Sequence, residues 1–587
     1  MLVLAWTTLE CPMAKVYRPR LIELAARYAK RGVGFALVDS APQDSLAELR
    51  ADSDLTGAPC PVVPDAAGRL AKRFGVTRST EVLVLDAKLA VLYRGAIDDQ
   101  YGYRRAEDGG VGTYRKDAPE HRHLEAALEA RLAGQAVPLA ATDPLGCVLS
   151  WPEPGADGPG FHETVEPILQ QHCQSCHHRG GSAPFALTDY EEVKGWAGMI
   201  AEVTREGRMP PWNADPAVGH FKNARRLSPD EKAAIAAWVE GGAAKGDAAN
   251  APAPLEFPTG WGIGEPDLVL ELEEFAIPAE GRLDYRYVKI PTDFTEDRWI
   301  QSYQVISTSP EVVHHVLVFS RDKRLSREER KKMRDLRPWR PPLNFLQFVK
   351  NAPAPERGEY LQRLDRVGRR APMVREAGGL AGYFMSNLPG NGPTVLEPDQ
   401  GVLLTAGATL IFQLHYTPDG KAKKTRTKVG IVFRKDPPKR AIDVTAVATV
   451  AFKLPAGASE VVVENDTTLG RDALLYAMKP HMHLRGKAFR YVAVLPDGEE
   501  RHLLEVPAYD FDWQHDYVLA EPMFLPKGTV VRCRAVFDNS SANPYNPDAT
   551  EDVYFGLQTE EEMMIGYLVV EWDPGNKDWA GKPSGDD

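Results

Sequence analysis

The chain has 587 residues, of which 43% are hydrophobic and 26% charged, a composition typical of a globular protein with roughly four domains. Its net charge of −12 argues against nucleic acid as a partner, because phosphate binding requires a basic surface. The sequence contains no apolar run of 18 residues, so we expect no membrane-spanning helix, and six cysteines are too few for a disulfide scaffold.

Residues 1–145 alternate predicted strands and helices in the order of a thioredoxin fold, so we expect an α/β domain there. Strands are expected at residues 2–6, 33–38, 81–85 and 91–95, and helices at 14–30, 66–74 and 119–133. Cys11 stands at the start of the first helix, where the helix N-terminus lowers the pKa of a thiol and favours its reactivity.

The segment Thr8–Cys11 reads T-x-x-C and resembles the active-site element of redoxin (peroxiredoxin-like) proteins. The resemblance implies that Cys11 is a catalytic thiol, and Cys60 is the candidate that resolves its oxidised form. Leu4 stands where that family carries proline, and no second cysteine follows at C-x-x-C spacing. Two interpretations stay open: a thiol enzyme, and a degenerate redoxin domain with a structural or docking role. Cys147, in the linker that follows, has no evident partner.

The segment Cys173–His177 reads C-x-x-C-H, the signal for covalent attachment of a c-type haem. Two thiols add to the haem vinyl groups in such a motif, and the adjacent histidine is an axial ligand of the iron. Residues 155–248 resemble a cytochrome c domain, an all-α fold, which places the sixth ligand in a loop like that of Met209. The resemblance implies one covalent haem c, held by Cys173, Cys176, His177 and Met209.

Covalent haem attachment takes place outside the cytoplasm, so we expect a periplasmic or otherwise extracytoplasmic location. The first residues lack the basic region and cleavage site of a signal peptide, which predicts a start further upstream or a leader already removed.

Residues 262–575 contain short β-rich runs separated by turn signals, which predict two all-β antiparallel sandwiches. The first is expected at residues 262–436 and the second at 437–575. A basic run at residues 321–340 is expected to be an inserted amphipathic helix.

Five of the fourteen histidines form three tight groups in this region. His314 and His315 are adjacent in one predicted strand, and His415 ends another. His481 and His483 form an H-x-H pair, whose spacing puts both imidazoles on one face of a strand. Three imidazoles suit copper or zinc, whereas two imidazoles with a methionine suit copper, because the soft thioether stabilises Cu(I).

This pattern resembles the copper type II, ascorbate-dependent monooxygenases, the family of peptidylglycine α-hydroxylating and dopamine β-monooxygenases. The resemblance implies jelly-roll sandwiches, two copper ions and O₂ as a co-substrate. The implied ligands are His314, His315 and His415 for the copper that takes up electrons, and His481, His483 and Met563 for the copper that binds oxygen. Met563 is assigned because Thr559–Met563 reproduces the family motif T-x-x-E-M.

Two features depart from that family. Cys533 is the only cysteine of this half of the chain, whereas family members carry several disulfides there. Lys479 stands two residues before the H-x-H pair, where the peptide hydroxylases carry an arginine that holds a substrate carboxylate. A lysine keeps the positive charge but loses the bidentate fork, so a small-molecule or peptide substrate stays unspecified.

We therefore expect a copper-dependent monooxygenase that hydroxylates a C–H bond with O₂. Its tethered haem would pass electrons from an upstream donor to the copper at His314, His315 and His415. Two other functions stay open: a non-enzymatic electron-transfer or copper- and haem-binding protein, and a thiol peroxidase with redox appendages.

Overall fold

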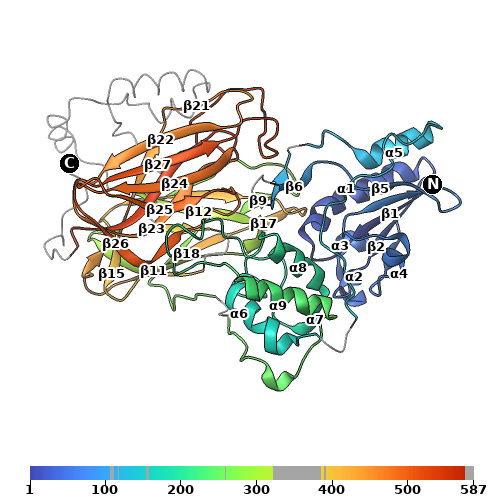
Figure 1. The fold of residues 1–587 in the computed structure, drawn as a ribbon, viewed down its shortest axis with the longest axis horizontal. Helices are drawn as coiled ribbons and strands as arrows, with labels where there is room; N and C mark the ends of the chain where they lie inside the picture. Colours follow the sequence, from blue (N-terminus) through green and yellow to red (C-terminus); the bar gives the residue numbers. More distant parts are fainter. Residues whose placement is uncertain are drawn as a thin grey trace.

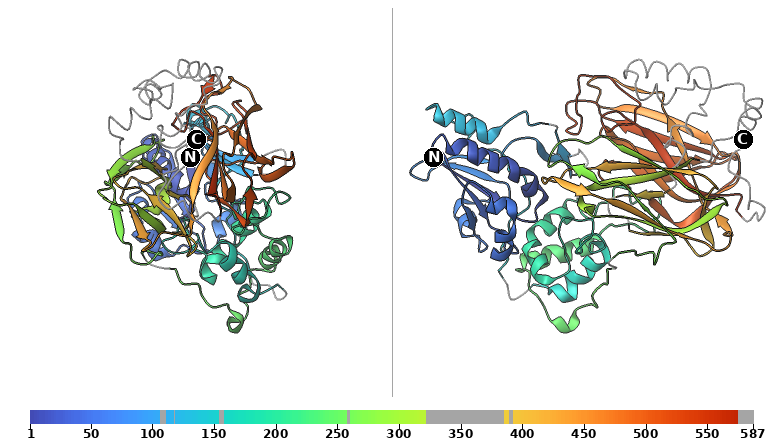
Figure 2. Two further views of the ribbon diagram at one scale, coloured as in Figure 1. Left: turned by 90° about the vertical axis from the view of Figure 1, so that its left-hand side faces the viewer. Right: turned by 180° about the vertical axis from the view of Figure 1, so that it is seen from behind.

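The computed structural model describes residues 1–105, 111–116, 118–153, 158–257, 260–321, 385–388 and 392–574. The chain is multidomain, with an N-terminal α/β domain, a helical segment and a mostly β C-terminal region of antiparallel sheets (Figure 1). The α/β domain and the β-rich region lie at opposite ends of the long axis, and the helical segment lies between them on one side (Figure 2). Beyond residue 321, the predicted basic helix lies outside the described residues. No helix among the described residues is long and apolar enough to cross a membrane.

The N-terminal α/β domain is built on one mixed sheet with the strand order β3-β2-β1-β4-β5. Its elements are β1 (Leu2–Thr7), α1 (Pro12–Ala29), β2 (Gly34–Asp39), α2 (Leu46–Ala51), α3 (Ser53–Thr56), β3 (Val62–Pro64), α4 (Arg69–Phe74), β4 (Val82–Leu85), β5 (Val91–Gly95), β6 (Tyr101–Arg105), β7 (Val111–Arg115) and α5 (His123–Leu132). Strands β1, β2 and β3 are parallel, and β4 and β5 are antiparallel to their neighbours. The predicted strands and long helices are present, whereas β3, α2, α3 and the β6–β7 hairpin were not predicted.

Strand β1 distributes its side chains to two apolar clusters, one on each face of this sheet. Val3 and Ala5 join the cluster that α1 and α5 cover, while Leu4 and Trp6 join the cluster on the α4 side. This period of two is what a strand buried on both faces requires.

The helical segment spans residues 161–250 and contains only helices among its named elements. These are the π-helical turn Phe161–Val165, α6 (Glu166–His172), α7 (Tyr190–Gly195), α8 (Ala197–Arg205), α9 (Pro229–Glu240) and the 3₁₀ turn Ala248–Asn250. Helix α9 begins with the capping box expected from its sequence, because the side chains of Ser228 and Glu231 each accept the other's main-chain N–H. Trp238 and Phe161 are buried in the core of the segment.

The first β unit (residues 268–433) consists of two antiparallel sheets that enclose one core. Its strands are β8 (Leu268–Glu271), β9 (Phe275–Ile277), β10 (Arg286–Pro291), β11 (Arg298–Ser307), β12 (Val313–Arg321), β13 (Met385–Asn387), β14 (Thr394–Val395), β15 (Gln400–Leu404), β16 (Thr409–Tyr416), β17 (Lys423–Thr425) and β18 (Thr427–Phe433). One sheet has the order β10-β16-β12-β13, and the other joins β15, β11, β18 and β8, with β19 (Arg440–Ala441) at its edge. Phe412 from one sheet and Ile431 from the other lie in the same buried cluster.

The second β unit (residues 443–572) repeats this plan. Its strands are β20 (Asp443–Thr449), β21 (Lys453–Leu454), β22 (Val461–Thr468), β23 (Ala473–His481), β24 (Gly486–Val494), β25 (Glu500–Val506), β26 (Tyr517–Leu525), β27 (Val530–Phe537), β28 (Val553–Tyr554) and β29 (Met564–Trp572). Sheets β20-β29-β23-β26 and β22-β27-β24-β25 enclose a core that includes Cys533, which is fully buried.

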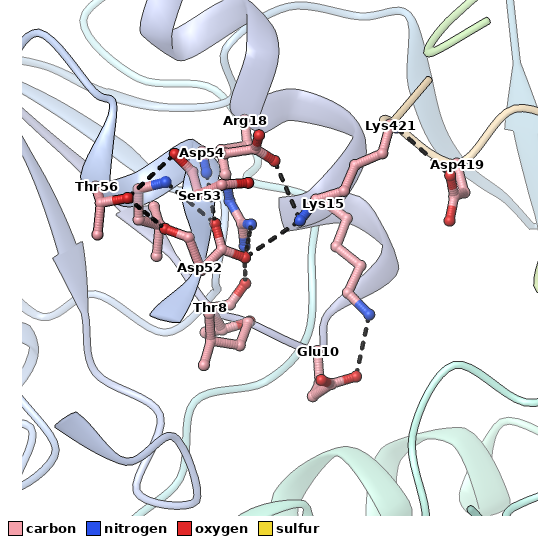
Figure 3. A network of polar contacts seen from close by, with 12 residues as sticks. Thr8, Glu10, Lys15, Arg18, Asp52, Ser53, Asp54, Thr56, Asp419 and Lys421 are labelled. Carbon is pink, nitrogen blue, oxygen red and sulfur yellow. Dashed lines mark hydrogen bonds and ion pairs between the residues drawn. The ribbon is translucent and has the colours of Figure 1, made fainter. Parts of the chain in front are cut away.

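A polar network fixes the first β unit against the α/β domain (Figure 3). The ammonium of Lys421, in the loop after β16, lies 3.2 Å from a carboxylate oxygen of each of Asp52 and Asp54. Arg18, whose side chain is buried, binds the same Asp52 oxygen at 3.1 Å and donates to the main-chain oxygen of Thr8 at 2.7 Å. Gly420 has φ +96°, and a Cβ there would lie 2.4 Å from a main-chain oxygen of α1, so this contact requires glycine.

Candidate metal centre

His314, His315 and His415 come together at the ends of two paired strands of the first β unit. His315 lies opposite His415 in the β12–β16 pairing, and the register shifts between Val313 and His315. Consecutive side chains in a regular strand point to opposite faces, and a bulge re-aims one of them. The irregularity at His314 therefore allows two adjacent imidazoles to face the same site.

One atom from each of these three histidines lies within 4.8 Å of the other two, as a shared metal ion would require. Burial lowers the pKa of His315 and His415 well below the usual value, so both imidazoles are neutral and have a free lone pair. His315 Nε2 and His415 Nδ1 are buried and have no hydrogen-bond partner among the described residues. Buried polar atoms are normally paired, so these two nitrogens fit a metal ion well.

The H-x-H pair lies at the end of β23 in the second β unit. The rings of His481 and His483 are 5.2 Å apart, with their planes at 86°. His481 Nδ1 donates to Gln514 Oε1 at 2.6 Å, and His483 Nδ1 donates to the main-chain oxygen of Glu561 at 2.9 Å. These acceptors fix the proton on Nδ1 of each ring and leave Nε2 as the candidate ligand atom. Burial lowers the pKa of His481 to about 3 and that of His483 to about 4.

A buried carboxylate ties Met563 to this pair. Glu562 is 0% exposed, and its Oε2 accepts the main-chain N–H groups of His483 at 2.9 Å and Met563 at 3.3 Å. Its Oε1 accepts the N–H of Arg485 at 2.6 Å, and burial raises the pKa of Glu562 to about 7. Through Glu562 the structure thus ties the main chain of Met563 to that of His483. In the sequence Glu562 is visible only as part of the motif that ends at Met563, and no local signal indicates that its carboxylate organises the turn.

One aromatic layer separates the two histidine groups. The Phe511 ring stacks on His314 with centroids 5.2 Å apart, and it meets the His483 ring at 6.1 Å. The Tyr285 ring lies 4.8 Å from that of His415 and 6.2 Å from that of His483. The two candidate metal sites are therefore neighbours in the interface between the β units.

Lys479 lies on β23, two residues before His481. Its side chain is buried, and burial lowers the pKa of its ammonium to about 8, against the opposing effect of the Asp516 carboxylate. The charge also acts on His315 and His481, so Lys479 belongs to the surroundings of both histidine groups.

The C-x-x-C-H motif follows α6 directly. The N–H of His177 donates to the main-chain oxygen of Cys173 at 2.9 Å, so the motif forms a tight turn with Cys176 inside it. His177 Nδ1 donates to the main-chain oxygen of Phe185 at 3.1 Å, which leaves Nε2 as the ligand atom, as in an axial histidine. Burial raises the pKa of Cys173 to about 12, and neither cysteine of the motif is in a disulfide bond. The donor set fits a covalently attached haem.

Met209 begins a loop that is docked on the second β unit. Its own N–H donates to the main-chain oxygen of Val203 in α8 at 3.2 Å. Further along, Phe221 bridges to Leu519 in β26, the edge strand of its sheet. Two main-chain bonds flank this bridge, from Lys222 N–H to Val518 at 2.9 Å and from Ala520 N–H to His220 at 2.8 Å. The loop thus covers a sheet edge that would otherwise be open.

Aromatic side chains extend this docking toward the H-x-H pair. The Trp212 ring lies 4.9 Å from that of Tyr517 and 5.9 Å from that of His515. His515 also contacts the main chain of Pro211, and its neighbour Gln514 is the residue that orients His481.

Cys11 stands at the N-terminus of α1, as predicted, but its partner differs from the expected one. The Sγ of Cys147 lies 2.6 Å from that of Cys11. Cys60 precedes β3 and packs on a different apolar cluster. Strands β1 and β3 are both parallel to β2, so the start of β3 and the end of β1 lie at opposite ends of the strands. The structure therefore places Cys147, and not Cys60, beside Cys11.

Comparisons with known proteins add information on the first domain. No family model matches the chain, and no curated protein matches it. An uncharacterized conserved protein from Geobacillus kaustophilus is 27% identical, with 26% of this chain and 78% of that chain covered and a TM-score of 0.22. A hypothetical protein from Sinorhizobium meliloti 1021 is 24% identical, with 25% and 77% covered and a TM-score of 0.21. Both matches fall on the N-terminal α/β domain.

The buried His515 makes a pH dependence testable. Burial lowers its pKa to about 3, so the folded protein keeps it neutral while the unfolded chain binds a proton below its normal pKa of about 6.5. Its contribution to stability is present above pH 6.5 and is lost as the pH falls toward 3, by about 1.4 kcal/mol per pH unit. The free energy of unfolding of the His515→Gln variant, measured with denaturant between pH 7 and pH 5, should depend less steeply on pH than that of the wild type. The difference should correspond to about one proton. The matched control His502→Gln, at an exposed position, should keep the wild-type slope.

Proposed function

We propose that the two histidine groups each bind one copper ion and that the protein is a copper-dependent monooxygenase that hydroxylates a C–H bond with O₂. The observation that carries the proposal is the buried triad of His314, His315 and His415, with ligand atoms within 4.8 Å of one another. Neutral imidazoles suit copper or zinc, and the addition of Met563 to the neighbouring pair favours copper. Bound copper would supply the one-electron chemistry that activates O₂ toward a C–H bond.

The chain's own residues contribute orientation and exclusion of water. Gln514 and the Glu561 carbonyl hold His481 and His483 in one tautomer, and Glu562 fixes the turn that joins them to Met563. Phe511 and Tyr285 fill the space between the two sites and are almost fully buried. Such preorganised surroundings keep metal ligands in place without reorganisation.

The remaining domains fit roles in electron supply. We interpret residues 161–250 as a cytochrome c domain in which Cys173, Cys176, His177 and Met209 hold one haem c, a one-electron carrier. The β units correspond to the two predicted jelly-roll sandwiches, and the α/β domain to a thioredoxin-like redoxin. An upstream donor outside this chain and an extracytoplasmic location follow from the haem.

The docking of the Met209 loop changes where electrons are expected to enter. From the sequence we expect electrons to enter at the triad of His314, His315 and His415. The contacts between Pro211 and His515, and between Gln514 and His481, instead form a continuous connection from the loop to the H-x-H site. We therefore propose that the H-x-H site receives electrons from the helical segment.

The substrate is limited by the position of Lys479. Because this ammonium is buried and lies close to Asp516, it is not an open anchor for a substrate carboxylate. A substrate without a terminal carboxylate fits the site better than a peptide acid does.

Metal stoichiometry tests the proposal directly. Protein matured with haem and loaded anaerobically with Cu(I) should contain two coppers per haem. His315→Ala and Met563→Ala should each lower this ratio to one, because each variant removes a ligand from a different site. His502→Ala, which alters an exposed histidine of the second β unit, should keep two coppers. A wild-type ratio of one or zero contradicts the proposal and leaves a haem protein with binding domains.

The loop contact has a separate test. Trp212→Ala removes the ring that packs on Tyr517 and His515, so amides of β26 should exchange hydrogen faster and haem in copper-loaded protein should reoxidise more slowly under O₂. Trp572→Ala, in the same β unit but outside this contact, is the matched control. Faster exchange with unchanged haem reoxidation would show that electrons do not pass through this contact.

A further inference from the structure

Cys11 and Cys147 form a second chemical site, between the α/β domain and the helical segment. Cys11 follows β1, whereas Cys147 lies beyond α5, 136 residues later in the chain. Their Sγ atoms are 2.6 Å apart, and an S–S bond of about 2.05 Å would need only a small side-chain movement. Both cysteines are free thiols in this structure.

Ser79 holds the two thiols together. Its hydroxyl donates to Cys11 Sγ at 3.0 Å and accepts the N–H of Cys147 at 3.0 Å. The N–H of Ser79 donates to the main-chain oxygen of Cys147 at 3.0 Å, and Leu149 N–H donates to Thr77 at 2.9 Å. The segment around Cys147 is therefore paired with the loop before β4 in a fixed register.

The pair combines a thiolate with a thiol. Burial raises the pKa of Cys11, but hydrogen bonds from Cys147, Ser79 and the main chain outweigh it and lower the pKa to about 6. The same hydrogen bond, together with burial, raises the pKa of Cys147 well above its usual value. At neutral pH Cys11 is the nucleophile, and Cys147 keeps the proton that stabilises it.

Access to the pair is limited to small molecules. Cys11 is 0% exposed and Cys147 is 7% exposed. Both belong to the apolar cluster that contains Trp196 of the helical segment, so a docked domain covers them. A small cavity lined by Thr8, Cys147 and Trp196 lies beside the pair.

We propose that Cys11 and Cys147 are a reversible dithiol–disulfide couple that is oxidised by hydrogen peroxide. The Cys11 thiolate attacks one peroxide oxygen, the O–O bond breaks, and the products are a Cys11 sulfenic acid and, after protonation, water. Cys147 then attacks Cys11 Sγ, the S–O bond breaks, and a second water leaves. One peroxide is reduced, two thiols are oxidised to one disulfide, and an external dithiol reverses the reaction. Neither step depends on the proposed copper chemistry.

The disulfide would also act on the domain arrangement. Cys147 belongs to the connection between the α/β domain and the helical segment, close to Val148, whose N–H contacts the Met199 sulfur of α8 at 3.4 Å. Oxidation would link this connection to the start of α1 by a disulfide bond.

Disulfide mapping tests the couple. Full-length protein is treated with stoichiometric hydrogen peroxide, free thiols are alkylated, and digested peptides are identified by mass. We expect a peptide that links Cys11 to Cys147 and disappears on treatment with dithiothreitol. Cys60→Ser should give the same link, whereas Cys147→Ser should leave Cys11 as a sulfenic acid that dimedone captures. A link from Cys11 to Cys60, or a Cys11 that stays reduced, would overturn the inference.

The role of Ser79 gives an independent readout. Ser79→Ala removes a hydrogen bond to the thiolate, so the midpoint of the pH profile for Cys11 oxidation should rise by about one pH unit or more. At pH values below the midpoint, each pH unit by which the midpoint rises lowers the rate of Cys11 oxidation roughly tenfold. Ser150→Ala, in the same connecting segment but bonded to α8, should leave the profile unchanged. An unchanged profile in Ser79→Ala would show that Ser79 does not stabilise the thiolate.

Discussion

The candidate metal centre depends on one physical constraint, that a buried imidazole nitrogen needs a partner. Leaving such a nitrogen unpaired costs about 1–3 kcal/mol. The ring nitrogens in this interface that are buried without a hydrogen-bond partner among the described residues include His315 Nε2, His415 Nδ1 and His483 Nε2. Metal coordination resolves the constraint, since each nitrogen has a free lone pair and the rings are already neutral. The surrounding carboxylate, amide and carbonyl groups then serve to fix ring orientation.

One loop connects the parts of this molecule that carry chemistry. Residues 510–516 place Phe511 against His314, Gln514 against His481 and His515 against the docked loop of the helical segment. A single short segment therefore touches both histidine groups and the adjoining domain. A change in its conformation would alter all three contacts together, which makes residues 510–516 the structural link between them.

The sequence predicted local features well and contacts between distant segments less well. Strand alternation placed β1 and β4, and the capping box placed α9, because these signals lie within a few residues. The adjacency of His314 and His315 was visible, but the bulge that lets both rings face one site depends on pairing with β16. The partner of Cys11 was missed for the same reason. Sequence spacing gives no indication that the segment of Cys147 pairs with the loop of Ser79. The order of β1 to β3, which separates Cys60 from Cys11, also comes from pairing between distant segments.

The helical segment is the element that sets the positions of the other domains. On one side its core includes Cys11 and Cys147 of the α/β domain and its connection, with Cys173 packed against the same cluster. On the other side its loop adds to the edge of β26. A two-electron thiol couple and a one-electron haem would thus share one apolar core. The α/β domain also contacts the first β unit directly, because Gly420 packs against the main chain of Lys15 in α1, so the helical segment is one of two connections between Cys11 and the β-rich region.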